Sequence, residues 1–381
     1  MDPTGPLARR FPLVARPRPG CPPLDDRISA LRALAESAVT MGDQKSASAV
    51  WNQAALLASD VGLPDLARQM CHRHAATYLR ARPLGAQAAR CALEPLVNLA
   101  RLAIRDGDSD SAFQLLTDLF DATASRRDTV IDGMTIPAAN LTATADDHAR
   151  VCEWLWSVLL ADGTRALTSA GRWKDAHEHL RRRRGIGMRL LDGRQVAILS
   201  HCATGDASSA LALLQESTLT EAWEKAVAAC LTLLCLQQDG HATDTPTDAM
   251  YERYLALEPA PGLLAFRVRL GLTILDLAGA EQGATAGVAA RLVKETIHAA
   301  DGYAARDILE HKACAGLMSE RERATLASAV HLSSLGRGVL SVHLMADLCA
   351  AVQRSENTIK ESWEAAMTQQ RDVGGGTSPT P

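Results

Sequence analysis

One spacing recurs along the chain and limits what it can fold into: a glycine, an alanine five residues later, and a larger residue four after that. It occurs at Gly42-Ala47-Trp51, Gly62-Ala67-Cys71, Gly107-Ala112-Leu116, Gly171-Ala176-Leu180 and Gly205-Ala210-Leu214. Glycine permits the left-handed backbone just beyond a helix C-terminus. The alanine then lies one turn into the next helix, on the same face as the larger residue. The spacing therefore predicts helical hairpins in which a methyl group lets a neighbouring helix approach closely.

Aspartates beside these corners strengthen the prediction. Asp43, Asp108, Asp110 and Asp206 follow a corner glycine within three residues. A carboxylate suits the positive N-terminal end of a helix. We therefore expect a new helix to start directly after each corner.

The intervals between corners match the length of a known repeat. Gly171 and Gly205 are 34 residues apart, and the 65 residues from Gly42 to Gly107 and 64 from Gly107 to Gly171 are each close to two such periods. A period of 34 is that of the tetratricopeptide repeat. Gly171, Trp173 and Ala176 resemble the Gly-x-aromatic-x-x-Ala step that opens the second half of that repeat. At the other corners the aromatic position holds Gln44, Pro64, Ser109 and Ala207, and the Trp-x-x-Leu-Gly signature of the first helix is not visible.

The chain thus resembles a degenerate tetratricopeptide-repeat protein over roughly residues 25–300. The resemblance implies an all-α fold, an α-solenoid of antiparallel helix pairs that serves as a protein- or peptide-binding scaffold. Composition agrees with helices, because hydrophobic residues make up 47% and aromatics only 4%. That balance suits close-packed helices better than a sheet core.

Charge and cysteine content exclude several classes. The net charge of −4 gives no overall drive toward nucleic acid or an anionic membrane. The nine cysteines are scattered and odd in number, which favours reduced, buried thiols in a cytoplasmic protein. We expect neither a signal peptide nor a membrane span, since no apolar run approaches about 20 residues. The excess of arginine over lysine and the abundant alanine are associated with a GC-rich, actinobacterial genome.

The rhythm of the sequence predicts its organisation. Residues 1–24 hold seven prolines and four arginines, which predict an extended tail that lies on the surface or is disordered, or a basic arm that docks on a partner. A first helical-repeat set (25–126) and a second (146–302) flank a connecting loop (127–145) at the junction of the two halves. Residues 303–368 are expected to form a C-terminal helical cap or small helical domain, and residues 369–381 a disordered tail.

Candidate binding residues cluster in the second half. The run Arg181, Arg182, Arg183 and Arg184 could anchor an acidic peptide or a phosphate, or simply form a solvated helix end stabilised by the dipole. Trp154 and Trp156 point to different helix faces, so one could line a groove, or both could fill the core. His177 completes the set.

No catalytic residue, metal ligand or cofactor is predicted. Zinc needs three or four convergent ligands, so packing in the core explains Cys71 better than a metal site formed with His72 or His74. His177 and His179 lie about 200° apart around a helix and cannot share a metal.

These features favour a non-catalytic scaffold for a protein or peptide partner, with nucleic acid and membrane not expected. One alternative is a component, a cyclase or an accessory subunit, of a lanthipeptide-type biosynthetic complex, with acid–base groups drawn from His72, His74, His177, His179 and His201.

The other alternative is a transcriptional regulator. Residues 318–326 resemble the opening helix of the LuxR-type helix-turn-helix, and residues 355–360 resemble the start of its recognition helix. The spacing between the two pieces is longer than in that family, and three glutamates (Glu356, Glu361 and Glu364) outnumber Lys360, although phosphate contacts need net positive charge.

Overall fold

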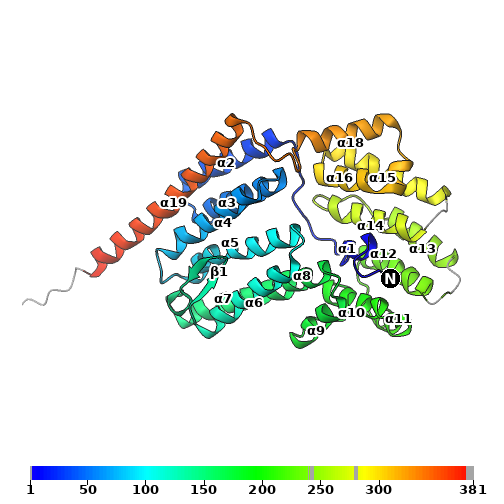
Figure 1. The fold of residues 1–381 in the computed structure, drawn as a ribbon, viewed down its shortest axis with the longest axis horizontal. Coiled ribbons are helices and arrows are strands. Elements are labelled where there is room, and N and C mark those ends of the chain that lie inside the picture. Colours follow the sequence, from blue (N-terminus) through cyan, green and yellow to red (C-terminus); the bar gives the residue numbers. More distant parts are fainter. Residues whose placement is uncertain (1, 239, 241–243, 279–281, 375–381) are drawn as a thin grey trace, which may run out of the picture. The chain divides into compact units, whose positions relative to one another are not determined.

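A computed structural model describes residues 2–238, 240, 244–278 and 282–374, and most of them are α-helical. The chain divides into two compact units (Figure 1). Unit 1 comprises residues 1–24 and 164–335, and unit 2 comprises residues 25–163 and 336–381. The sequence placed the junction of the halves at 127–145, whereas the units divide between Gly163 and Thr164.

Unit 2 is a set of consecutive helices: α2 (Leu24–Met41), α3 (Gln44–Val61), α4 (Pro64–Leu79), α5 (Ala86–Arg105), α6 (Ser109–Ser125) and α7 (Ala145–Val158), followed by the π-helical turn η2 (Leu159–Gly163). Helix α3 packs on α4, α4 on α5, and α5 on α6 and α7. The last helix, α19 (Val342–Gly374), returns to lie against α3 and α4, as its red ribbon beside the blue helices shows in Figure 1.

An aromatic ladder joins α19 to this set. The rings of Trp51 and His74 stack with centroids 5.7 Å apart, Tyr78 meets His74 edge-on, and Trp363 of α19 meets Tyr78 at 6.0 Å. Burial lowers the pKa of His74 to about 3, so the ring is neutral and packs as an aromatic. His74 is therefore a core residue, and Cys71, for which the sequence predicted core packing, is buried as well.

Unit 1 contains α1 (Pro6–Arg10), α8 (Thr164–Ser169), α9 (Trp173–Arg182), α10 (Asp192–Ala203), α11 (Ala207–Gln215), α12 (Ala222–Gln238), α13 (Asp244–Leu255), α14 (Leu264–Ala278), α15 (Gln282–Ala299), α16 (Gly302–Glu310), α17 (Lys312–Gly316) and α18 (Glu320–Leu332). Helices α9 to α13 each pack on the next, and α14 packs on α15 and α16. In the described part of both units, no helix is long and apolar enough to cross a membrane.

The glycine corners adopt the backbone that the spacing predicts. All five glycines have positive φ, from 59° at Gly42 to 90° at Gly62. Asp43, Asp108 and Asp206 each accept a hydrogen bond from a backbone N–H of the following helix. The five alanines are fully buried (Ala47, Ala67, Ala112, Ala176 and Ala210). The corners and the helix starts are thus confirmed.

The segment expected as an irregular connecting loop (127–145) contains regular structure. Strands β1 (Thr129–Ile131) and β2 (Met134–Ile136) form an antiparallel hairpin, followed by the 3₁₀ turn η1 (Ala138–Asn140). Asp132 and Gly133, both at positive φ, form its two-residue turn. An Asp-Gly pair is the preferred sequence for such a turn. The Asp132-Gly133 dipeptide is therefore a sequence signal for this hairpin.

Residues 303–368 do not form one cap or domain, because the chain passes from unit 1 to unit 2 between Leu335 and Gly336. The two pieces that resemble a helix-turn-helix lie in α18 of unit 1 and within the continuous helix α19 of unit 2. A recognition helix therefore does not start at Ser355. Of the expected disordered tail (369–381), residues 369–374 belong to α19, and residues 375–381 lie outside the described residues.

Candidate functional site

The proline-rich N-terminal segment, residues 2–23, is an ordered part of unit 1; we call it the arm (dark blue in Figure 1). It begins with the short helix α1 and continues as extended chain from Phe11. The sequence predicted the extended conformation, but not that four of its side chains would be buried: Ala8, Phe11, Leu13 and Cys21. The arm docks on the protein's own helices rather than lying loose on the surface.

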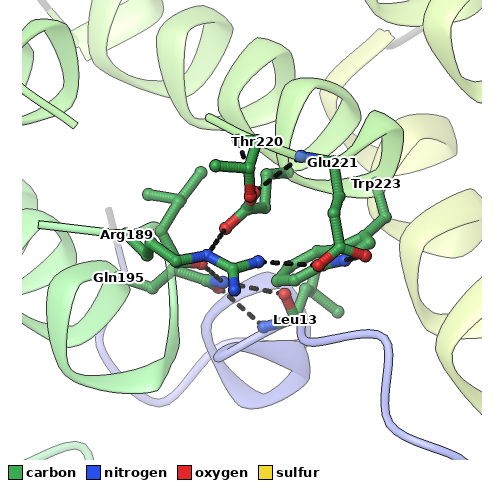
Figure 2. Close-up of polar contacts among 8 residues, drawn as sticks. Leu13, Arg189, Gln195, Thr220, Glu221 and Trp223 are labelled. Carbon is green, nitrogen blue, oxygen red and sulfur yellow. Dashed lines mark hydrogen bonds and ion pairs between the residues drawn. The ribbon is translucent and has the colours of Figure 1, made fainter. Parts of the chain in front are cut away.

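The side chain of a single glutamine holds the middle of the arm through the backbone of Leu13. The Leu13 N–H donates to Gln195 Oε1 at 2.7 Å, and Gln195 Nε2 donates to the Leu13 carbonyl at 2.7 Å and to the Leu190 carbonyl at 2.9 Å (Figure 2). Gln195, on α10, is completely buried. An amide that bonds both groups of one residue binds an extended chain as a neighbouring β-strand would, without reading the side chain.

A second backbone clamp lies eight residues further along the arm. The Cys21 N–H donates to Asp301 Oδ2 at 2.8 Å, and the Gly302 N–H donates to the Cys21 carbonyl at 2.8 Å. The other oxygen of Asp301 caps α16 by accepting from the Ala304 N–H. The helix cap and the arm therefore share one carboxylate.

Side-chain contacts complete the attachment. Trp173 Nε1 donates to the Pro3 carbonyl at 2.9 Å. Arg10 forms an ion pair with Asp276, and Arg16 forms one with Asp192. We name the residues that hold the arm the arm-binding surface: Trp173 of α9, Asp192 and Gln195 of α10, Asp276 of α14, and Asp301 before α16.

The buried carboxylate of Glu224 fixes the segment that precedes α10, next to the arm-binding surface. Arg189 Nε donates to Glu224 Oε1 at 3.0 Å, and the other oxygen of Glu224 accepts from the Thr220 N–H and hydroxyl and from the Glu221 N–H (Figure 2). Burial alone would raise the pKa of Glu224, but these bonds outweigh it and lower the pKa to about 2. The network fixes the strand-like residues before α10, and Leu190 among them accepts from Gln195.

A surface pocket lies beside the first turn of the arm. It has a volume of about 320 Å³ and is lined by arm residues Gly5, Pro6 and Leu7 and by Leu234 and Gln237 of α12. The pocket is largely open to solvent, so it is a depression at the edge of the arm and not a void in the core.

No family model, curated protein or solved structure matches the chain.

The arginine run does not meet the arm. Arg181 and Arg182, both exposed, donate to the carboxylate of Glu178 one turn earlier, at 2.8 and 2.6 Å. These bonds lower the pKa of Glu178 to about 2. Arg183 is the C-cap that follows the last residue of α9, and Arg184 comes next at positive φ. The geometry fits the solvated, dipole-stabilised helix end.

The two tryptophans lie in unit 2, on α7, and neither belongs to the buried core. Trp156 is exposed, and Trp154 is half-buried beneath the guanidinium of Arg90, 5.3 Å from its ring. The core-filling alternative is therefore wrong for both residues.

The histidines converge only in part. His177 meets His201 edge-on with centroids 5.7 Å apart, and His201 Nδ1 lies 3.2 Å from Asp206. Burial, followed by the charge of His201, lowers the pKa of His177. His72 instead pairs with Asp132 in unit 2. The sequence missed the residues of the arm-binding surface altogether, because a single buried glutamine carries no motif.

Proposed function

We propose that the protein is a non-catalytic helical scaffold, related in design to tetratricopeptide-repeat proteins, that holds an extended segment of a partner protein on the arm-binding surface. The observation that supports this proposal is the double bond of the buried Gln195 to the backbone of Leu13. A buried amide that satisfies only backbone groups recognises the extended form of a chain and accepts many sequences.

Energetics favour the same function. Fixing an extended segment costs conformational entropy at each residue, and proline reduces that cost because its φ is already restricted. The arm contains seven prolines within residues 1–24 and is held by two backbone clamps. Helical-repeat proteins bind extended segments on such surfaces. The proposal includes a cytoplasmic location, which the scattered, odd-numbered cysteines of the sequence favour.

The proposal is tested with random peptides displayed on phage and the full-length chain as bait. The bait carries Leu13→Asp, which detaches the arm because a carboxylate cannot enter the site that Leu13 occupies. The control bait carries Leu13→Asp together with Gln195→Met, which keeps the length of the side chain and removes its amide. Circular dichroism verifies that both baits are helical. We expect extended, proline-containing peptides to be enriched on the first bait and lost on the second; equal recovery on the two baits would refute the proposal.

A further inference from the structure

The charges of the arm-binding surface are arranged around Leu13. Arg10, three residues before Leu13, pairs with Asp276, and Arg16, three residues after Leu13, pairs with Asp192. Leu13 between them is 1% exposed. Thus the surface presents two carboxylates that flank an apolar site and the amide of Gln195.

Asp276 is built to receive a cation. His311 Nε2 lies 2.9 Å from its Oδ1, and Arg10 pairs with its Oδ2. Burial alone would raise the pKa of Asp276, but the bonds from His311 and Arg10 hold it below its ordinary value. A partly buried carboxylate that stays ionised favours an arginine, which binds it through charged hydrogen bonds.

Further contacts continue the attachment beyond Arg16. The Arg18 N–H donates to the Gly262 carbonyl at 2.9 Å. Arg269 of α14 is half-buried, and burial lowers its pKa most; the positive charges of Arg18 and Arg10 lower it further, whereas Asp307 raises it.

We propose that the arm-binding surface selects a partner segment that is extended, has arginines six residues apart and a leucine midway between them, and that the protein's own arm closes this surface as a competing internal ligand. This inference rests on the proposed function and adds the class of ligand and the regulation of the same site. A tethered ligand competes at an effective concentration of the order of millimolar, so a partner must match it well or arrive when the arm is detached.

The test measures binding of a fluorescein-labelled peptide with the sequence of residues 2–23 to full-length chains by fluorescence anisotropy. One chain is wild type; a second carries Leu13→Asp. A third carries Arg10→Glu and Arg16→Glu, which place like charges against Asp276 and Asp192 and leave the apolar contacts of the arm intact. A second peptide has Arg10 and Arg16 replaced by glutamine.

We expect the labelled peptide to bind both arm variants at least about 30-fold more tightly than wild type, because a closed arm reduces the fraction of competent protein. The peptide without Arg10 and Arg16 should bind the variants about 10-fold more weakly or worse, which is the loss expected for one charged hydrogen bond.

Any other result contradicts one part of the inference, as follows. Equal binding to wild type and to both variants overturns the internal competitor and leaves the proposed scaffold standing. Arginine-independent binding to the variants overturns the charge selection alone. Absence of binding to both helical variants overturns the inference, and failure of the phage selection in addition overturns the proposed function.

Discussion

Gln195→Met is the sharpest perturbation of the arm, because it removes one amide and almost nothing else. It deletes two hydrogen bonds to Leu13 and one to Leu190, each 2.7–2.9 Å long and buried. A neutral bond contributes about 1 kcal/mol net, and a buried group left unpaired costs about 1–3 kcal/mol. We therefore expect the closed arm to lose about 2–4 kcal/mol relative to the detached arm.

Amide hydrogen exchange measures this loss directly. If the arm opens locally, exchange at Leu13 should accelerate about 30- to 900-fold, a factor of ten for each 1.36 kcal/mol. The matched control is Gln215→Met on α11, where the side chain is exposed, and exchange of the arm should stay unchanged. Unchanged exchange at Leu13 in a folded Gln195→Met protein would refute the assignment of Gln195 as the residue that holds the arm.

Three further predictions test the surroundings. Glu224→Gln should lower the free energy of unfolding by about 2 kcal/mol, measured by urea titration at pH 7. Because the pKa of Glu224 in the folded protein is about 2, its contribution to stability is present above the ordinary carboxyl pKa and is lost as pH falls toward 2. The free energy of unfolding of the variant should therefore depend less on pH in this acid range than that of the wild type. Gly171→Ala should lower the melting temperature more than Gly205→Ala. Both glycines have positive φ, but only a methyl group at position 171 would meet Thr4, whose Cγ2 would lie 2.6 Å away. Replacement of Arg181 and Arg182 by alanine should leave both the exchange rate of the arm and the midpoint of urea unfolding unchanged, because exposed ion pairs contribute little to stability.

Local rules predicted the helical framework. Gly42 and its four counterparts reverse the chain because their backbone requirement is local, and Asp43, Asp108 and Asp206 cap helices by bonds to residues two or three positions away. The burial of the alanines followed from helical periodicity alone. Nothing beyond near neighbours was needed for these elements.

The candidate site could not be predicted in the same way. Gln195 lies 182 residues from Leu13, and Asp301 lies 280 residues from Cys21. Buried glutamines are uncommon, and composition does not reveal which one is buried. Proline and arginine content correctly indicated extended chain in the arm, but the partner that orders it is distant in sequence. The path of α19 back to α3 was likewise a long-range packing event.

The long separation between the arm and its surface has a consequence during synthesis. The arm leaves the ribosome before the surface that holds it, and Asp301 follows 280 residues after Cys21. At a translation rate of about 5–20 residues per second, roughly 15–60 s pass before the last clamp exists. Gln195, which holds Leu13, follows 182 residues after it, so Leu13 lacks this partner for roughly 9–36 s at the same rate. A chaperone or the arm of an adjacent nascent chain can engage it during that time.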